Sequence, residues 1–225
     1  MDIVAELKKI NLVLSSKAGS VKILNNINLN IMKGERVALI GPSGSGKSSL
    51  LMILAGLENP TSGKVSILNN DLGKLNEDQK AKFRGKNIGI IFQEFHLIPT
   101  MTALENVSLP LELMGEKNSI DKAKKIMNEV NLFHRLDHFP SQLSGGEQQR
   151  VAIARALIAK TNLILADEPT GNLDYKTSKE IFSYFLKLKK LKKTIIFATH
   201  NRELANRADY KLFISNGDIK RVNAR

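Results

Sequence analysis

The feature that most constrains this chain is the glycine-rich run from residue 41 to residue 48, which reads GPSGSGKS. It fits the pattern G-x-x-x-x-G-K-[ST] and lies between a predicted strand, Arg36–Ile40, and a predicted helix, Lys47–Gly56. Glycines allow successive backbone N–H groups to converge on phosphate oxygens, and a helix N-terminus adds partial positive charge. A chance glycine-rich turn would not need these flanking elements. The sequence therefore predicts a site for a nucleoside triphosphate, although kinases, GTPases and motors share this loop.

The phosphate loop also supplies two side chains with distinct expected roles. The ammonium group of Lys47 can reach the β- and γ-phosphates, and the hydroxyl group of Ser48 can bind Mg²⁺. The residues expected around the triphosphate here are Gly41, Pro42, Ser43, Gly44, Ser45, Gly46, Lys47, Ser48 and Ser49.

A second candidate site element is an apolar strand, Leu163–Ala166, that is followed directly by Asp167 and Glu168. Ligands of open α/β sheets bind at the carboxyl ends of the strands, which is where this acidic pair falls. Side chains alternate along a strand, so the two carboxylates are expected to do different work. Asp167 suits Mg²⁺, directly or through water, and Glu168 suits polarising the water that attacks the γ-phosphate. A solvated strand end is the alternative, and the phosphate loop makes it the weaker one.

The run LSGGEQQR, residues 143–150, predicts a second anion-binding helix start. Ser144 and Glu147 match a capping box, so an ordinary helix N-terminus is one interpretation. Gly145 and Gly146, however, are unfavourable in a first helical turn. Glycine at these two positions would allow an anion to approach the backbone closely, because it has no side chain.

With these motifs in place, the sequence resembles the ATP-binding cassette (ABC) family over nearly its whole length. The run LSGGE separates that family from other phosphate-loop proteins. Gln93 resembles the family's Q-loop glutamine, Asp174 its D-loop aspartate and His200 its switch histidine, all in the family's order.

The resemblance implies an ATPase that converts ATP and water to ADP and phosphate with Mg²⁺. Its implied catalytic residues are Lys47, Glu168 and His200. Its implied Mg²⁺ ligands are Ser48, Gln93 and Asp167, and Gln93, Ser144, Gly145, Gly146 and Asp174 join the phosphate loop in binding ATP. It also implies a homodimer that forms on ATP binding, with each ATP between one chain's phosphate loop and the other's LSGGE run.

Three further stretches resemble one branch of the family, that of the lipoprotein-release, macrolide-export and cell-division cassettes (LolD, MacB and FtsE, with the YbbA type). They are residues 92–99, 102–107 and 166–174. Members of this branch work with an integral, permease-type membrane protein in a separate or fused chain. We expect such a partner to dock at the segment Gln93–Thr102, and a cell-division regulator is the alternative within the branch.

The chain departs from the family in its adenine site. A cassette usually stacks adenine on an aromatic ring near its N-terminus, but no Phe, Tyr or Trp precedes Phe83 here. We expect adenine to rest on aliphatic side chains near Val21 or Leu14 instead. The sequence therefore predicts weak discrimination between bases.

The pattern of elements predicts an α/β fold with one domain over residues 1–225. Short apolar strands separated by helices indicate a parallel sheet with crossover helices. Residues 103–160 show helical spacing broken at Pro110, Gly115 and Pro140, and Ser215–Asp218 is a hairpin turn between two strands. The family resemblance implies a RecA-like P-loop NTPase core over about 1–93 and 161–225, an N-terminal antiparallel β subdomain, and an inserted helical subdomain over about 94–160.

Composition narrows the alternatives. The absence of cysteine excludes disulfides and thiol chemistry, and no apolar run approaches the roughly 20 residues of a membrane helix. The start of the chain does not resemble a secretory signal, so we expect a cytoplasmic protein, peripheral on the inner face of the membrane.

The net charge of +12 permits an anionic partner, so a soluble ABC protein acting on DNA or ribosomes is an alternative. Such proteins usually carry two cassettes or a long coiled-coil insertion, which this chain lacks, and no nucleic acid partner is expected. A regulatory module without catalysis is disfavoured by intact Lys47, Glu168 and His200.

Overall fold

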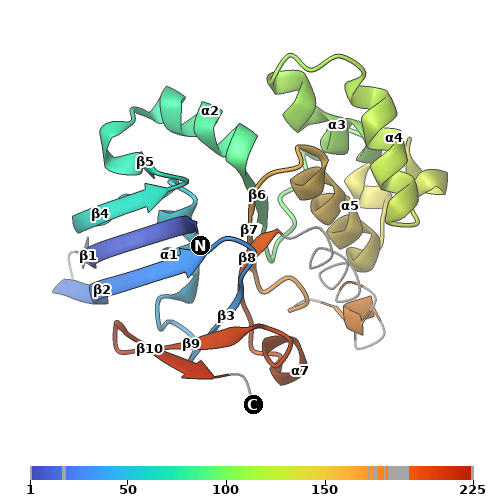
Figure 1. The fold of residues 1–225 in the computed structure, drawn as a ribbon. Helices are drawn as coiled ribbons and strands as arrows, with labels where there is room; N and C mark the ends of the chain where they lie inside the picture. Colours follow the sequence, from blue (N-terminus) through green and yellow to red (C-terminus); the bar gives the residue numbers. More distant parts are fainter. Residues whose placement is uncertain are drawn as a thin grey trace.

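A computed structural model describes residues 2–16, 19–171, 173–174, 177–179, 181 and 193–223 of the chain. Its described strands form two sheets that lie against each other (Figure 1). One has four strands in the order β2-β1-β4-β5, and the other has six in the order β10-β9-β3-β8-β7-β6.

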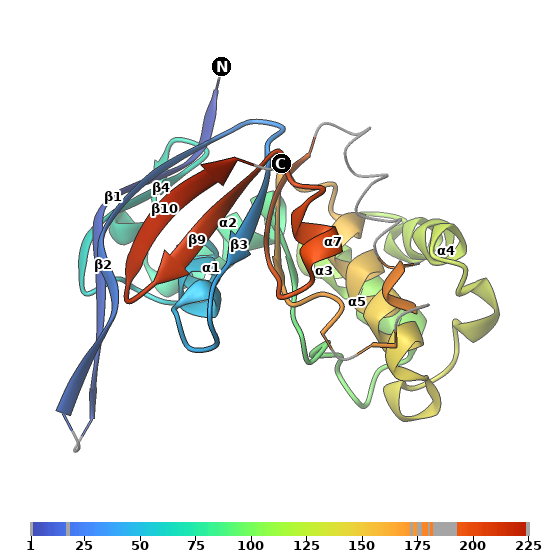
Figure 2. The same cartoon turned by 90° about the horizontal axis from the view of Figure 1, so that it is seen from below.

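The four-stranded sheet is antiparallel, as predicted for the N-terminal part of the chain. Its strands are β1 (Ile3–Ser16), β2 (Gly19–Met32), β4 (Ser62–Ile67) and β5 (Asn70–Asp71). The pairing of β1 with β4 reaches Asn11 and Ser62, whereas β1 and β2 stay paired as far as Ser16 and Gly19. The β1–β2 hairpin therefore extends past the rest of its sheet, which Figure 2 shows from the side.

The six-stranded sheet is mainly parallel and confirms the predicted α/β organisation. Its parallel strands are β3 (Arg36–Ile40), β6 (Ile88–Ile91), β7 (Leu163–Asp167), β8 (Thr194–Ala198) and β9 (Tyr210–Ser215). β9 also forms the predicted antiparallel hairpin with β10 (Asp218–Asn223). Asn216 and Gly217 both have positive φ, the conformation that a tight hairpin turn needs.

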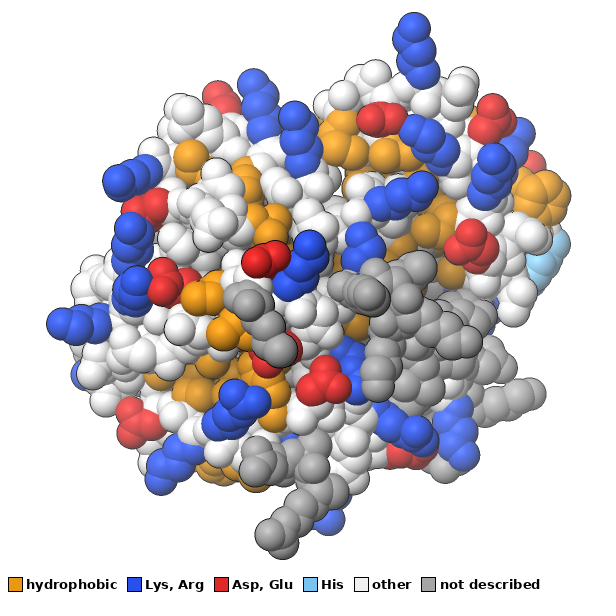
Figure 3. All heavy atoms as spheres, in the orientation of Figure 1, with side chains coloured by type: hydrophobic (Ala, Val, Ile, Leu, Met, Phe, Trp, Pro, Cys, Tyr) orange, Lys and Arg blue, Asp and Glu red, His pale blue; other side chains and the backbone are white. Residues whose placement is uncertain are grey.

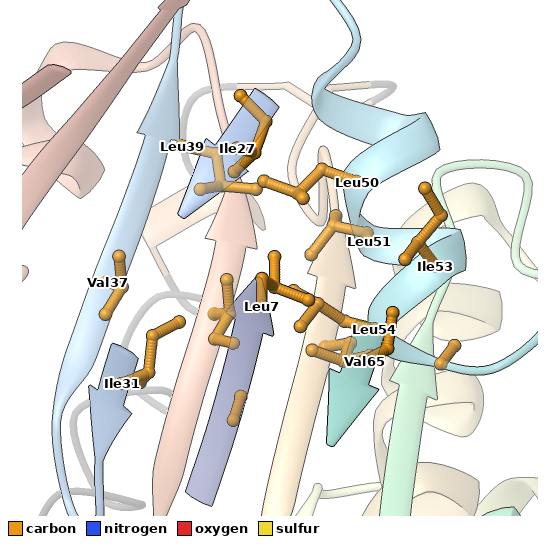
Figure 4. Close-up of a cluster of buried hydrophobic side chains, with 14 of the residues drawn as sticks. Leu7, Ile27, Ile31, Val37, Leu39, Leu50, Leu51, Ile53, Leu54 and Val65 are labelled. Carbon is orange, nitrogen blue, oxygen red and sulfur yellow. The ribbon is translucent and has the colours of Figure 1, made fainter. Parts of the chain in front are cut away.

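Strand alternation divides the interior into two cores on opposite faces of the six-stranded sheet. On β7, Leu163 and Leu165 belong to one core, and Ile164 and Ala166 belong to the other. The first core lies between the two sheets and contains helix α1 (Lys47–Leu54). Figure 4 shows its packing, with side chains from α1 and from strands of both sheets: Leu7, Ile27, Ile31, Val37, Leu39, Leu50, Leu51, Ile53, Leu54 and Val65.

The second core carries a helical lobe, which lies on the side away from the antiparallel sheet (Figure 1). Its elements are α3 (Ala103–Leu113), α4 (Ser119–Glu129), α5 (Gly145–Ile158) and two short 3₁₀ turns, η2 (Phe133–Arg135) and η3 (Pro140–Gln142). No helix among the described residues has both the length and the apolar character needed to span a membrane.

The prediction that Pro110 breaks the helical pattern was wrong, because Pro110 lies inside α3. Proline removes the N–H that would bond to the carbonyl of residue 106. The helix continues for less than one further turn, and its buried stripe of Ala103, Val107 and Leu111 anchors it to the core. Tertiary packing therefore outweighs the loss of one late helical hydrogen bond.

Helix α2 (Glu77–Asn87) was not predicted, since it has no apolar stripe. It follows a short turn, η1 (Leu72–Lys74), and begins with a capping box between Asn76 and Gln79. This cap was the signal in the sequence that could have located it. A last short helix, α7 (Arg202–Ala205), follows β8.

Candidate active site

The phosphate loop connects β3 to α1 as predicted, and its glycines adopt backbone conformations that favour glycine. Gly41, Gly44 and Gly46 have φ of 149°, 74° and 99°. A Cβ atom on Gly41 would also lie 2.1 Å from the carbonyl oxygen of Ile214 in β9. At Gly41 the sequence therefore places glycine where no side chain fits, and α1 begins immediately after Gly46.

Lys47 lies folded over the loop at the start of α1. Its side-chain Nζ donates to the carbonyl oxygens of Gly41 at 3.1 Å and Pro42 at 2.9 Å. The residue is only 7% exposed, so its ammonium group is held close to the loop's own backbone. Ser48 and Ser49 follow in the first turn of α1.

A hollow of about 250 Å³ lies beside the loop and suits the group that the loop is expected to hold. Residues 42–45 form one wall, residues 21–23 of β2 another, and residues 215–217 of the β9–β10 turn a third. Ser45 Oγ is buried here without a hydrogen-bond partner among the described residues. A buried hydroxyl group of this kind is a ready donor for a phosphate oxygen.

Strand register brings the other candidate residues to the same edge of the sheet. Leu39 of β3 pairs with Ala198 of β8, and Ala198 pairs with Asp167 of β7. Ala166 in turn pairs with Ile91 of β6. Because these strands are parallel, the segments that leave their carboxyl ends emerge together. Those segments carry the phosphate loop, Gln93, Glu168 and His200.

Glu168 and His200 meet at this edge. The backbone N–H of His200 donates to Glu168 Oε2 at 3.1 Å, and His200 Nε2 lies 3.3 Å from Glu168 Oε1. The Glu168 side chain is 13% exposed and the imidazole 54% exposed. Strand β7 ends at Asp167, and Glu168 has a φ of 43°, so its direction is set by the turn and not by strand alternation.

Gln93 lies beside the loop that follows Glu168. A Cβ atom on Gly171 would be 3.3 Å from both Gln93 Nε2 and Glu168 Cβ. The same loop is held by Gln149 of α5, a residue that the sequence analysis missed. Gln149 is buried, and its Nε2 donates a hydrogen bond to the carbonyl oxygen of Pro169 at 2.9 Å. Its signal was a polar residue in line with the apolar positions Ala152 and Ile153 of the same helix.

The LSGGE run opens α5, and the predicted capping box is confirmed. The Glu147 N–H donates to Ser144 Oγ at 3.3 Å, and the Ser144 N–H donates to Glu147 Oε2 at 2.8 Å. Burial raises the pKa of Glu147, but the hydrogen bonds from Ser144 and Arg135 outweigh it and leave the pKa below the ordinary value. Glu147 is therefore an ionised cap at a positive helix end.

The two glycines of the run differ in their surroundings. A Cβ atom on Gly146 would lie 2.5 Å from Thr177 Cγ2, so packing alone gives a reason for glycine there. At Gly145 a Cβ atom would meet nothing closer than 3.9 Å. The close approach of an anion to this backbone stays a prediction.

Asp174 precedes Thr177, which is helical. It accepts hydrogen bonds from the Thr177 N–H at 3.0 Å and from Thr177 Oγ1 at 2.6 Å. Asp174 and Gly146 therefore share Thr177 as a neighbour.

Helix α5 belongs to the second core and α1 to the first, so the LSGGE run and the phosphate loop of one chain start helices on opposite faces of the sheet.

Comparison with known proteins identifies this constellation. The sequence profile of the family described as "ABC transporter" matches residues 24–171, more than half of the chain. The chain belongs to the ABC transporter family. Its phosphate loop, acidic strand end and LSGGE run all fall inside the matched range.

Its relatives include a lipoprotein-releasing system ATP-binding protein, LolD of Legionella pneumophila (strain Lens), 43% identical over 97% of both chains. The uncharacterized ABC transporter ATP-binding protein YbbA of Escherichia coli (strain K12) is 46% identical over 89% of both chains. Among solved structures, the ATP-binding cassette MJ0796, in a dimeric post-hydrolysis state bound to ADP and Pi, superposes with a TM-score of 0.92. It is 38% identical, over 98% of this chain and 99% of that one. This chain is thus an ATP-binding, ABC-type ATPase subunit with the P-loop NTPase fold that the sequence predicted.

Proposed function

We propose that this chain is the ATPase subunit of a lipoprotein-release or related export transporter, whose membrane-spanning part is a separate permease-type chain. The observation that carries the proposal is the convergence of the phosphate loop, Gln93, Glu168 and His200 at one sheet edge, in a chain whose relatives include LolD and YbbA. Its proposed place is the inner face of the membrane. Its proposed working parts are a core of about 1–93 and 161–225 and a helical subdomain of about 94–160.

The proposed chemistry assigns a role to each side chain at this edge. Ser48, Gln93 and Asp167 would hold Mg²⁺, which supplies positive charge to the phosphate oxygens. Glu168 would accept a hydrogen bond from the attacking water, and His200, 3.3 Å from its Oε1, would fix that carboxylate and face the γ-phosphate. The low exposure of Glu168 favours this work, because few competing waters reach its carboxylate.

The proposed active unit is a homodimer. In one chain the LSGGE run and the phosphate loop start helices on opposite faces of the six-stranded sheet. In the proposed dimer, a second chain brings its LSGGE run to the ATP held by the first chain's phosphate loop. ATP carries several negative charges, and two helix N-termini with Lys47 compensate them when two chains meet. Dimeric states of the similar cassette MJ0796 support this assembly.

The proposed docking segment for the membrane partner is Gln93–Thr102, between β6 and α3. Buried Asn106 of α3 fixes its far end: Oδ1 accepts from the Ile98 N–H at 2.8 Å, and Nδ2 donates to the carbonyl oxygens of Ile98 and Met101. These hydrogen bonds fix the backbone of the segment, and exposed positions such as Thr100 remain accessible to a segment of the membrane partner.

A DNA- or ribosome-directed ATPase is the second candidate, favoured only by the net charge of +12. On the face shown in Figure 3, Lys and Arg side chains are scattered among Asp and Glu. A nucleic-acid site would favour a continuous basic patch instead.

Site-directed crosslinking distinguishes the two candidates, since the natural chain has no cysteine. We expect Thr100→Cys, expressed in cells and treated with a crosslinker, to be captured with an integral membrane protein. The control Asn70→Cys, exposed on β5 of the other sheet, should not be captured. Salt-sensitive binding to DNA without any membrane-protein adduct would refute the transporter assignment.

The hollow beside the phosphate loop leads to a prediction about base choice. Val21, Ile23 and Pro42 supply its apolar side chains, and none of its lining residues is aromatic. Val21 is 60% exposed, and Leu14 faces it across the β1–β2 ladder. We therefore expect competition titrations to give affinities for ATP and GTP within about tenfold of each other, because contacts with aliphatic side chains do not distinguish adenine from guanine.

Adding a ring provides the matched test. Val21→Tyr should tighten nucleotide binding by about 5-fold or more, the equivalent of roughly 1 kcal/mol of stacking. Leu113→Tyr, at a 79% exposed position at the end of α3, should leave it unchanged. A strong preference of the natural chain for ATP would overturn this prediction.

A further inference from the structure

Arg155, in the third turn of α5, makes contacts that the catalytic roles above do not use. Its guanidinium Nη1 donates to the carbonyl oxygen of His96 at 2.6 Å, and Nη2 donates to that of Phe95 at 2.7 Å. The side chain crosses from the helix that LSGGE opens to the segment that carries Gln93. Arg155 is partly buried, and this burial lowers the pKa of its guanidinium, which has these two carbonyls as partners.

The turn that Arg155 holds has an unfavourable backbone. Phe95 and His96 are consecutive non-glycine residues with φ of 56° and 46°, a conformation that side chains disfavour. Such a turn persists where surrounding contacts determine it. Within the turn, the Phe95 N–H donates to the carbonyl of Phe92 at 3.3 Å, and the rings of Phe92 and His96 meet edge to face. A planar fork with two parallel donors matches a pair of adjacent carbonyls in a way that no other side chain does.

The same turn also contacts the start of α5. The position of a Cβ atom on Gly145 lies 4.0 Å from Phe95 Cζ, so the Phe95 ring borders the LSGGE run. One aromatic residue, two positions after Gln93, is thus in contact with α5 at both places: its ring at Gly145 and its carbonyl at Arg155.

We infer that Arg155 is a positioning residue, which locks the Phe95–His96 turn to α5 and thereby sets the position of Gln93 relative to the LSGGE run. Displacement of the Gln93 segment then moves α5, and displacement of α5 moves Gln93. The inference rests on the proposed role of Gln93 at Mg²⁺ and adds the residue that holds it in place.

Lys193, directly before β8, offers a matched control near the C-terminal end of α5. Its Nζ also donates to two backbone carbonyls, those of Lys160 and Thr161, just beyond the C-terminal end of α5. Arg155→Met and Lys193→Met therefore each remove a partly buried cation that bridges two carbonyls. Only the carbonyls that Arg155 contacts belong to the segment that carries Gln93.

The first readout is amide hydrogen exchange in nucleotide-free protein. We expect Arg155→Met to accelerate exchange over residues 93–98, whereas Lys193→Met should change exchange near residues 160–161 and not there. This measurement needs neither ATP nor metal. Unchanged exchange over 93–98 in Arg155→Met would overturn the inference.

The second readout is steady-state ATP hydrolysis in a double-variant cycle. Arg155→Met should lower kcat by about 10- to 100-fold with little change in KM for ATP, as for residues that orient a metal ligand. In a Gln93→Ala background the same substitution should cause no further loss. Losses that multiply in the double variant would show that Arg155 does not act through Gln93.

The single variants separate this inference from the proposal beneath it. If Gln93→Ala hydrolyses ATP normally, the role of Gln93 and the inference are both wrong. If Gln93→Ala loses activity and Arg155→Met does not, only the inference is wrong. Should Arg155→Met fold poorly, Arg155→Lys provides the same test, because an ammonium group keeps the charge without the two-pronged geometry. It should give a smaller loss in kcat and the same absence of additivity.

Discussion

Glu168→Gln is expected to lower the rate of ATP hydrolysis by about 10²- to 10⁴-fold, the range found when a general base is removed. The amide keeps the shape of the side chain and can still accept the His200 N–H, which now bonds to Oε2 at 3.1 Å. It lacks the negative charge that polarises water. Phosphate release at saturating ATP, measured on the purified chain, gives the rate directly, and ATP affinity should be retained.

The same variant should reveal the dimer. With hydrolysis blocked, each γ-phosphate continues to join the phosphate loop of one chain to the LSGGE run of the other. We expect Glu168→Gln with Mg-ATP to elute as a dimer in gel filtration, and the natural chain to be mainly monomeric because it keeps turning over. Adding Ser144→Arg places a bulky side chain at the α5 start, where Ser144 now caps the helix, and should abolish the dimer.

A carboxylate elsewhere provides the control for these effects. Glu105 forms the capping box of α3 with Thr102, and glutamine serves equally well at that position. Glu105→Gln should therefore hydrolyse ATP at the natural rate. A Glu168→Gln variant that stays monomeric at saturating ATP, or that keeps normal turnover, would contradict the assigned role.

The site could largely be predicted from the sequence because its parts sit at the ends of parallel strands. Each short apolar strand marks its own carboxyl end, and the residues that follow β3, β6, β7 and β8 must then emerge at one edge. Topology thus brings together the segments that carry Lys47, Gln93, Glu168 and His200, whereas the choice of Gln93 and His200 within those segments came from the family resemblance. The alternation argument for Asp167 and Glu168 failed only at the last step, because the chain leaves strand geometry at Glu168.

The parts that the sequence did not reveal are contacts between distant elements. Arg155 and Gln149 look like ordinary polar residues of α5, and their partners at residues 95–96 and 169 are backbone carbonyls, which leave no mark in the sequence. Helix α2 was not predicted, because a capping box without an apolar stripe is a weak signal for a helix. The continuation of α3 past Pro110 depends on packing that local propensity does not describe.

Lys47→Ala is expected to abolish measurable turnover, a loss of at least about 10²- to 10³-fold, because a preorganised charge at the reacting phosphate is removed. In the structure the ammonium group bonds to the carbonyls of Gly41 and Pro42. Both carbonyls belong to the phosphate loop, so the ammonium group already lies where the β- and γ-phosphates are expected to bind. Without it, the phosphate charge is left under-compensated and ATP should bind weakly.

Thermal unfolding with and without ATP tests this binding loss separately from catalysis. A ligand that binds only the folded chain raises its melting temperature, and Lys47→Ala should lose that rise. The control is Lys80→Ala: Lys80 is 5% exposed, and its Nζ also has two partners, Asn59 Oδ1 at 2.7 Å and Glu77 Oε1 at 2.9 Å. Losing this buried cation should lower the melting temperature while the rise with ATP persists, since Lys80 holds α2 and not the phosphate loop. An equal rise in Lys47→Ala and the natural chain would show that Lys47 does not bind the triphosphate.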